Sequence, residues 1–488
     1  MKYYSTRDTK KTNGIDSAVA IKNGLAPDGG LYMPSEIPAV SSSDILSLCK
    51  KSYAERAADI LSRFLCDYTF DELLSDCREA YGEARFPGGA APLVKLNDNI
   101  FVLELWHGPT GAFKDMALQI MPRLLSRALV KTGEKRTAHI LVATSGDTGK
   151  AALEGYRDID GIKITVFYPV DGVSKIQKLQ MATQEGGNVN VCAVKGNFDD
   201  AQNGVKKIFS DNEAKEKLNE KGVFLSSANS INWGRLAPQI AYYVSAYCDM
   251  INTGEIANGD LIDICVPTGN FGNIFAGYIA KLMGLPIRRF ICASNSNNVL
   301  TDFFETGTYD RNRKFHTTMS PSMDILISSN LERLLYLVSG PEKTREWMKQ
   351  LVCEGKYTVD AETKSALDRE FTACCSTEEN TAETIYNTFD KYGYLSDTHT
   401  ACALFASYKK ADGVKIVTDS TASPYKFASD VLASLGEKKP EDAFEAFELL
   451  NRKTGVDIPD SFVSLKTKAV RFDKVIEPNS MLDFVLDN

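Results

Sequence analysis

The stretch His107-Gly-Pro-Thr-Gly-Ala-Phe-Lys-Asp115 gives the clearest indication of the fold and the chemistry of this chain. Before it, Phe101–Leu105 has the pattern of a β-strand, and after it Met116–Val130 has apolar residues at helical spacing. Lys114 is therefore expected where a turn enters a helix, close to the partly positive helix N-terminus. A lysine at such a place is usually solvated, so a catalytic role for Lys114 depends on the loops that accompany it.

The composition is that of an ordinary globular protein. The chain has 488 residues, of which 43% are apolar and 25% charged. This length corresponds to roughly three domains of about 150 residues each. The net charge of −8 argues against a nucleic acid or an anionic membrane as partner, although it leaves room for a local basic pocket. We therefore expect a small-molecule substrate, no nucleic acid and no membrane.

The cysteine pattern and the termini favour a cytoplasmic protein. No run approaches the ~18 apolar residues that span a bilayer, and the N-terminus has no apolar signal core. The eleven cysteines are scattered, with no C-x-x-C motif, which is typical of reduced thiols. None of the four histidines is spaced with cysteine as a zinc site requires, so we expect no metal. The oligomeric state is not readable, and we expect a monomer in preference to a homodimer.

Strands and helices alternate along most of the chain. Residues 1–90 form a cap that ends near Phe86-Pro-Gly-Gly-Ala-Ala-Pro92. Beyond it, each short apolar run is followed by a loop and a helical pattern, which predicts right-handed crossovers and parallel sheets covered by helices. The expected strands are Phe101–Leu105, His139–Ala143, Ile162–Tyr168, Val189–Val194, Val223–Ser226, Leu261–Val266, Phe290–Ala293 and Val414–Thr418.

Ligands in such sheets bind at the carboxyl ends of the strands. Lys114, the loops 144–149 and 267–273, and Ser420–Thr421 each follow an expected strand. Segments that are far apart in the sequence are thus predicted to meet in one crevice.

The loop Thr268-Gly-Asn-Phe-Gly-Asn273 precedes a helical pattern. Glycines let backbone N–H groups approach an anion, and the helix N-terminus adds positive charge, so the loop suits a phosphate group. The alternative is a tight turn in which the glycines serve geometry alone. The loop is neither a P-loop nor the dinucleotide-binding G-x-G-x-x-G motif.

The loop Thr144-Ser-Gly-Asp-Thr-Gly149 has the same strand-to-helix setting. Its hydroxyl and N–H groups suit a substrate carboxylate. Ser, Thr and Asp are also the residues that cap helices, and for this loop taken alone capping is the simpler interpretation. With Lys114 and the 268–273 loop, however, it makes a set of three: a candidate Schiff-base lysine, a phosphate site and a carboxylate site. Pyridoxal phosphate requires the first two.

The chain resembles the threonine synthase family of pyridoxal-phosphate enzymes, which are of fold type II and similar to the tryptophan synthase β chain. The resemblance runs nearly end to end. It rests on Tyr4-Ser-Thr-Arg7, Gly24-Leu-Ala-Pro-Asp-Gly-Gly-Leu-Tyr32, His107–Asp115, Ala143–Gly149, Ser230-Ile-Asn-Trp-x-Arg235, Pro267–Gly272, Ser320-Pro-x-Met-Asp324, Ser328-Ser-Asn-x-Glu-Arg333 and Asp397-Thr-His-Thr-Ala401.

The resemblance implies an α/β fold with two lobes of parallel or mixed sheet, helices on both faces, and an N-terminal cap. The cap is expected at residues 1–90 and the catalytic domain at 91–425, with a mobile small lobe at about 136–245. Residues 426–488 are expected to be a tail that packs on the catalytic domain.

The resemblance also implies roles for individual residues. Lys114 would carry the cofactor as a Schiff base, and Thr421 would face the pyridine nitrogen. The cofactor phosphate would be held by Gly269, Asn270, Phe271, Gly272 and Asn273. The substrate carboxylate would be bound by Thr144, Ser145, Asp147 and Thr148. The candidates for the substrate phosphate are Lys175, Asn232, Arg235 and Ser329.

Two positions depart from the usual pattern of the family. Thr398 stands in the Asp-x-His-Thr-Ala motif where the family usually has proline, and Ser423 stands where it usually has a histidine close to the cofactor. These changes bear on substrate preference and not on cofactor use.

The expected reaction converts O-phospho-L-homoserine and water to L-threonine and phosphate, which makes the protein a carbon–oxygen lyase acting on phosphate. It proceeds by γ-elimination followed by addition of water at the β carbon. Two alternatives remain: a phospho-lyase or dehydratase that acts on a related amino acid, and a catalytically inactive relative used for binding.

Overall fold

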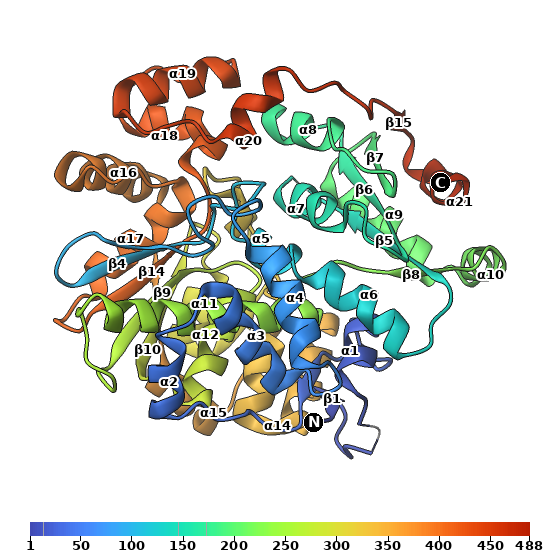
Figure 1. Cartoon of the computed structure of the whole chain (residues 1–488), viewed down its shortest axis with the longest axis horizontal. Coiled ribbons are helices and arrows are strands. Elements are labelled where there is room, and N and C mark those ends of the chain that lie inside the picture. The colour runs from blue at the N-terminus through green and yellow to red at the C-terminus, as the bar shows by residue number, and fades with distance from the viewer. Residues whose placement is uncertain (13, 145, 172) are drawn as a thin grey trace.

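Two β-sheets form the frame of the computed structural model, which describes all residues except 13, 145 and 172 (Figure 1). The larger sheet has the strand order β13-β10-β9-β14-β4-β3 and is parallel except for β3, the antiparallel edge strand. Its strands are β3 (Leu93–Lys95), β4 (Ile100–Glu104), β9 (Ile262–Pro267), β10 (Ile287–Ser294), β13 (Phe371–Cys375) and β14 (Ile416–Ser420).

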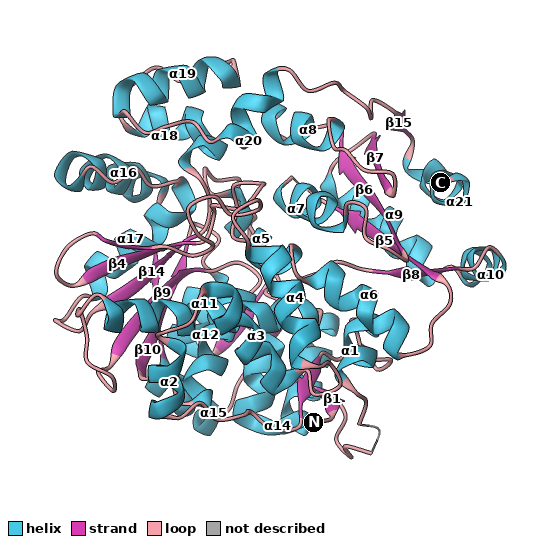
Figure 2. Ribbon diagram, in the orientation of Figure 1, coloured by secondary structure: helices cyan, strands magenta, loops and turns pink. Residues whose placement is uncertain are grey.

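The smaller sheet is parallel throughout and has the order β15-β7-β6-β5-β8. Its strands are β5 (Thr137–Ala143), β6 (Ile162–Pro169), β7 (Val189–Val194), β8 (Val223–Ser226) and β15 (Val475–Ile476). Figure 2 shows the two sheets apart from each other, each flanked by helices. Parallel strands covered on both faces are apolar along their length, and β9 is accordingly buried at every position.

The predicted α/β class is confirmed, and each of the eight expected strands is present. Three further strands of these sheets, β3, β13 and β15, were not expected from the sequence pattern. Small antiparallel pairs also join β1 (Tyr3–Ser5) to β2 (Tyr32–Pro34) and β11 (Thr308–Asp310) to β12 (Lys356–Thr358).

The N-terminal helices are α1 (Ser17–Asn23), α2 (Ser42–Leu48), α3 (Tyr53–Phe64) and α4 (Phe70–Tyr81). Capping boxes define where α3 and α4 begin. The Ser52 side chain accepts from the Glu55 amide while the Glu55 carboxylate accepts from the Ser52 amide, and Thr69 with Glu72 repeats the arrangement. These reciprocal bonds satisfy N–H groups that have no partner within the helix.

The remaining helices cover the two sheets and connect them. Among the described residues, none of the helices is long and apolar enough to cross a bilayer. They are α5 (Asp115–Leu118), α6 (Met121–Lys131), α7 (Asp147–Tyr156), α8 (Lys175–Ala182), α9 (Phe198–Ser210), α10 (Asn212–Glu220), α11 (Trp233–Asn252), α12 (Gly272–Met283), α13 (Val299–Thr306), α14 (Leu331–Cys353), α15 (Ala361–Glu370), α16 (Glu378–Tyr392), α17 (Thr398–Lys410), α18 (Ala428–Ser434), α19 (Ala443–Thr454), α20 (Asp460–Val463) and α21 (Met481–Asp487).

The helical pattern over Met116–Val130 is divided between α5 and α6. Pro122 lies in the first turn of α6 and has no N–H to donate to the carbonyl four residues earlier, so one helix cannot run through this point. The Leu118 carbonyl at the break is covered by α7, where Gly155 leaves no space for a side chain. The short helix α5 is thereby held between α6 and α7.

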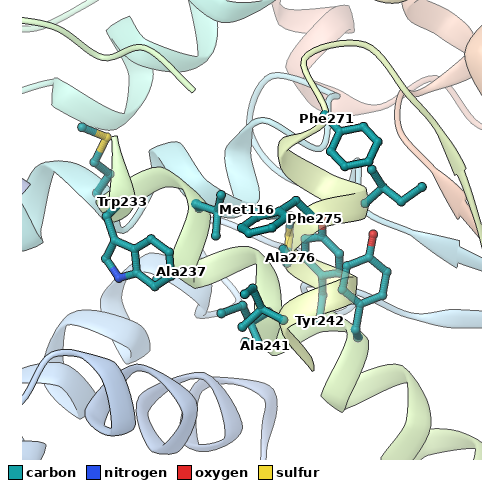
Figure 3. Close-up of a cluster of buried hydrophobic side chains, with 14 of the residues drawn as sticks. Met116, Trp233, Ala237, Ala241, Tyr242, Phe271, Phe275 and Ala276 are labelled. Carbon is teal, nitrogen blue, oxygen red and sulfur yellow. The ribbon is translucent and has the colours of Figure 1, made fainter. Parts of the chain in front are cut away.

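The core beneath the larger sheet is centred on α11 and α12. Figure 3 shows Trp233, Ala237, Ala241 and Tyr242 of α11 beside Phe275 and Ala276 of α12, all of them buried. Met116 of α5 lies in the same cluster, so the helix that follows Lys114 is anchored in the core.

The C-terminal segment runs from one sheet to the other, as its red colour in Figure 1 shows. Helices α18 and α19 pack on each other in a separate apolar cluster, and β15 then extends the smaller sheet at its β7 edge. Phe484 and Val485 of α21 are buried in the cluster that includes Phe167 of β6. The last residues of the segment are therefore part of the smaller sheet's own core.

Candidate active site

The loop that presents Lys114 is closed by a buried carboxylate. Asp115 accepts hydrogen bonds from the Thr110 amide (2.8 Å) and the Thr110 hydroxyl (2.9 Å). A side chain on Gly108 would collide with Asp115, because its Cβ would lie 2.6 Å away from that residue. Gly108 and Thr110 thus shape the turn, and Lys114 follows this turn at the N-cap position of α5.

The Lys114 ammonium group lies among polar groups of other elements, and 12% of its side chain is exposed. Its Nζ lies 3.3 Å from the Ser322 hydroxyl and 3.5 Å from Asp147 Oδ2. Burial lowers the pKa of Lys114; the carboxylate of Asp147 opposes this shift, while the charges of Lys426 and Arg235 add to it. A lysine in this setting exchanges protons more readily near neutral pH than a solvated one.

Asp147 joins the two sheets across the site. It begins α7 after β5 of the smaller sheet and receives Lys426 Nζ at 2.9 Å, the Ser322 hydroxyl at 2.8 Å and the Gln177 amide at 2.8 Å. Burial raises the pKa of Asp147, but Lys426 and Lys114 outweigh it and hold that pKa well below its usual range. Asp147 therefore acts as the counter-ion of two lysines.

Lys426 is a component of the site that the sequence analysis does not single out. Its side chain is completely buried, and its Nζ also donates to the Thr110 carbonyl at 3.0 Å. Lys426 thus ties the loop of Lys114 to Asp147. The sequence feature that could have identified Lys426 is its place in the stretch 421–427, which resembles a motif of the family.

The loop 268–273 has the features of an anion site. The backbone amides of residues 269–273 have no hydrogen-bond acceptor among the described residues. Phe271 adopts positive φ (64°) at the N-cap of α12, and a left-handed residue beside helical ones is a backbone arrangement that can bind an anion. Gly269 is needed for space, since a Cβ there would lie 2.8 Å from the Ser322 carbonyl oxygen. In this loop Phe271 adopts the positive φ, whereas Gly269 is needed only for space.

Residues 328–330 hold this loop from outside. The Asn330 amide donates to the Asn270 carbonyl at 3.0 Å, and the Ser328 hydroxyl donates to the Gly269 carbonyl at 2.7 Å. Ser329 is half-buried, with its hydroxyl 3.4 Å from Asn270 Oδ1. The predicted Ser329 thus lies beside the predicted phosphate loop.

Thr421 lies at the carboxyl end of β14, across from Lys114. Its carbonyl accepts from the Phe113 amide at 2.8 Å and its amide donates to the Thr400 hydroxyl at 3.2 Å. The Thr421 hydroxyl makes no hydrogen bond to any other described residue, so it is free for a ligand. Ser423 caps the turn that leads to Lys426.

Arg235 is buried without a carboxylate partner among the described residues. Its Nη1 donates to the Ala228 carbonyl at 2.8 Å, while its Nε has no partner there. Burial lowers the pKa of Arg235 to about 10. Asn232, by contrast, is fully engaged: its amide donates to the Ile21 carbonyl at 2.8 Å and its oxygen caps α11. Of the two candidates, Arg235 has the capacity left to bind an anion.

The other predicted substrate residues have different settings. The Thr144 hydroxyl accepts from the amides of Gly146 and Gly149, both at 3.0 Å, so it shapes the loop. Thr148 is half-buried in the first turn of α7. Lys175 is exposed at the start of α8. Ser145 lies outside the described residues.

His399 supports the site from the side of α17. Its Nδ1 contacts Asp397 Oδ2 at 2.7 Å, and its Nε2 accepts from the Ser322 amide at 3.0 Å. Because the Ser322 hydroxyl contacts both Lys114 and Asp147, this buried pair positions the group that lies between them.

Comparisons with known proteins identify the family of this chain. The family model for "Pyridoxal-phosphate dependent enzyme" matches residues 85–418, and that for "Threonine synthase N terminus" matches residues 2–81. The crystal structure of PLP-bound threonine synthase from Brucella melitensis superposes with a TM-score of 0.89 at 39% identity, covering 100% of this chain and 99% of that one.

Curated relatives fall into two groups. Threonine synthase of Pseudomonas aeruginosa is 38% identical over 465 residues, which cover 93% of this chain and 95% of the relative. Threonine synthase-like 1 of Macaca fascicularis is 42% identical over 433 residues and 86% of this chain, but the match spans only 58% of that longer protein. The matches to threonine synthases extend over nearly the whole chain, with both the catalytic region and the N-terminal region included. The chain belongs to the threonine synthase family of pyridoxal-phosphate dependent enzymes.

Proposed function

We propose that this protein converts O-phospho-L-homoserine and water to L-threonine and phosphate. The observation that carries the proposal is the position of Lys114: its buried ammonium group is held by Ser322 and Asp147 at the ends of the strands. A loop of free backbone amides, 269–273, belongs to the same set of strand ends. A reactive amine and an anion site in one crevice are what a pyridoxal-phosphate enzyme requires.

The residues present fit the cofactor. The amides of 269–273 and the N-terminus of α12 would hold its phosphate, and Lys114 would bond to its aldehyde carbon. The free hydroxyl of Thr421 suits a pyridine nitrogen, which it can approach without bringing a negative charge. When bound, pyridoxal phosphate supplies an electron sink for the charge left on the substrate carbon after loss of a proton.

Lys114 is the group that moves protons in this proposal. The reaction breaks the bond between the γ carbon and the phosphate oxygen and places a water oxygen on the β carbon, so protons must be removed and returned along the substrate chain. The lowered pKa of Lys114 suits both directions of transfer. Asp147 and the Ser322 hydroxyl keep its Nζ in place.

The charge of the site suits a phosphorylated amino acid. Lys114 and Lys426 both pair with the carboxylate of Asp147, and the charge of Arg235 is close enough to lower the pKa of Lys114. A substrate with a carboxylate and a phosphate would balance this excess. Arg235 is our candidate for the substrate phosphate, since a guanidinium binds phosphate with two parallel hydrogen bonds.

The decisive experiment is product analysis on O-phospho-L-homoserine. Purified protein loaded with the cofactor should release phosphate and L-threonine in equal amounts. Phosphate accompanied by a keto acid and ammonia would instead show a phospho-lyase on the same scaffold. Neither phosphate release nor threonine, in a protein that binds the cofactor, would leave only a binding function.

We further propose that the protein acts as a monomer in the cytoplasm. All eleven cysteines are free, which suits a reducing compartment. Light scattering on the purified protein measures the oligomeric state, and a stable dimer would contradict the monomer.

A further inference from the structure

Asp419 is a buried carboxyl group with no ion-pair partner among the residues that the structure describes. It lies on β14, two residues before Thr421, and is completely buried. Its Oδ2 is 2.7 Å from the Tyr243 hydroxyl, whereas its Oδ1 has no hydrogen-bond partner among the described residues. Asp263 on the adjacent strand β9 shows the usual alternative, because it is equally buried but is paired with Arg288 and Arg289.

The Tyr243 hydroxyl has one hydrogen and two acceptors. It lies 2.7 Å from Asp419 Oδ2 and 3.0 Å from the carbonyl oxygen of Asn273, in the first turn of α12. An ionised Asp419 would take this hydrogen, which would leave the Asn273 carbonyl without it and Oδ1 as a bare charge in the core. The bare charge is the main cost in a buried place, because the Asn273 carbonyl still belongs to the hydrogen-bonded helix α12.

A protonated Asp419 resolves the conflict. Its own O–H donates to the Tyr243 oxygen, and Tyr243 is then free to donate to the Asn273 carbonyl. We propose that Asp419 is kept neutral in the folded protein and acts, through Tyr243, as a positioning residue for the loop 269–273. This role rests on the cofactor-phosphate site proposed above.

The surroundings of Asp419 favour the neutral form. The titratable groups that face it are Tyr242 and Tyr243 of α11 and Cys265 of β9, and burial raises the pKa of each, so none supplies a charge. Burial likewise raises the pKa of Asp419, to about 8. Neutrality also suits the function, because a second anion beside the phosphate loop would repel the phosphate.

Loss of this proton has a predictable direction. As the pH rises through about 8, Asp419 ionises and draws the Tyr243 hydrogen towards itself, so the hydrogen bond between Tyr243 and the Asn273 carbonyl is lost. The loop should then hold the cofactor less firmly. The folded protein keeps the Asp419 proton up to about pH 8, whereas the unfolded chain loses it near pH 4. As the pH rises from about 4 to about 8, Asp419 therefore progressively lowers the free energy of unfolding.

The protonation state can be observed directly by infrared spectroscopy of the holoenzyme. Near pH 7 the parent should show the carbonyl stretch of a protonated carboxylic acid that is missing from Asp419→Asn. In the parent alone, this band should disappear as the pH rises through about 8. A parent spectrum without a protonated-acid band would overturn the proposal even if the Asn variant does not fold.

Cofactor retention during dialysis tests the positioning role. The parent should release the cofactor about fivefold faster when the pH is raised from about 7 to about 9.5. Asp419→Asn should lose most of this dependence, because its amide donates to Tyr243 at every pH. Tyr243→Phe should release the cofactor faster throughout. The matched control is Tyr247→Phe on the same helix, whose hydroxyl donates to the Asp260 carbonyl at 2.9 Å.

The same pH dependence in Asp419→Asn as in the parent would overturn the proposal, as would parent-like retention by Tyr243→Phe. Both measurements follow protonation and cofactor binding, so they stay informative if the product of the enzyme proves not to be threonine.

Discussion

Lys114 has one amino group, which the proposed reaction uses both to hold the cofactor and to move protons. We expect Lys114→Ala to reduce threonine formation by about a thousandfold or more. The fold should persist, because the Lys114 side chain makes no capping hydrogen bond to α5. Coupled measurement of threonine and phosphate, with melting followed by circular dichroism, tests both points. Near-normal turnover would transfer the role to Lys426, the other buried lysine of the site.

Arg235 has an unpaired Nε and no carboxylate partner among the described residues. If it binds the substrate phosphate, Arg235→Ala should raise KM for O-phospho-L-homoserine by about tenfold, since a charged hydrogen bond contributes roughly 1.5–3 kcal/mol. Inorganic phosphate should inhibit the variant much less than the parent. Arg78→Ala, which removes an exposed arginine paired with Glu55, is the control. Unchanged kinetics with a lower melting temperature would make Arg235 structural and leave Lys175 and Ser329 as the candidates.

Lys426 affects the protonation of Lys114. Lys426→Met removes a charge that lowers the pKa of Lys114 and frees Asp147 to pair more closely with it, so the pKa of Lys114 should rise. Since a base must be unprotonated to act, the acid limb of the pH profile of kcat should move to higher pH by about one unit. Lys426→Arg keeps the charge and should keep the parent profile. Coincident profiles for the Met variant and the parent would show that the two lysines are not coupled.

Single residues differ in how far the sequence predicts them. Lys114 is predicted because its loop has a distinctive pattern of glycine, proline and threonine. Lys426 and Asp419 are not, because their roles come from groups more than a hundred residues away: Asp147 for one and Tyr243 for the other. Asn232 illustrates the opposite case. Its motif suggests a substrate contact, while the structure uses both ends of its amide to join α11 to α1.

At the scale of elements, the turn from β9 into α12 depends on space at Gly269. A methyl group there would press on the Ser322 carbonyl at 2.8 Å. Gly269→Ala should therefore displace the loop and weaken cofactor binding by about tenfold, as overpacking of a tight contact does. Equilibrium dialysis of the cofactor measures the change. Gly187→Ala is the control, because its nearest neighbour would be 3.8 Å away. Equal cofactor affinity in the two variants would make the 268–273 loop an ordinary turn.

The strands that the sequence predicts are those with long apolar runs between glycine-rich loops. The strand β15 has two residues and β13 contains the Cys374–Cys375 pair, so neither carries a period that stands out. The break between α5 and α6 also escapes the helical pattern, since the apolar spacing continues across it. In that case a single missing N–H, at Pro122, decides the local structure.

At the scale of the molecule, we propose that the smaller sheet moves against the larger one when substrate binds. The expected boundary near residue 245 falls inside α11, which is one continuous helix packed on α3 and α12. We therefore place the end of the moving unit before Trp233 and include β15 and α21 in it. Asp147 is the contact that such a movement would make and break.

Structures with and without a substrate analogue test this movement. Superposed on the six-stranded sheet, they should differ by a rotation of the five-stranded sheet, and β15 should travel with β7. Asp147→Asn should favour the open arrangement, since it weakens the attraction to Lys114 and Lys426. Coincident positions of the smaller sheet in both structures would argue against a gating role.

The strand β15 also has a consequence for how the protein is made. Lys195 beside β7 and Glu477 after β15 form an ion pair although 282 residues separate them in the chain. On the ribosome, the smaller sheet therefore receives its edge strand only after all six strands of the larger sheet have been translated. During that interval the apolar side of β6 and β7 that α21 later covers is exposed to chaperones and to other nascent chains. Expression yield, more than enzymatic rate, should therefore suffer when residues 475–487 are deleted.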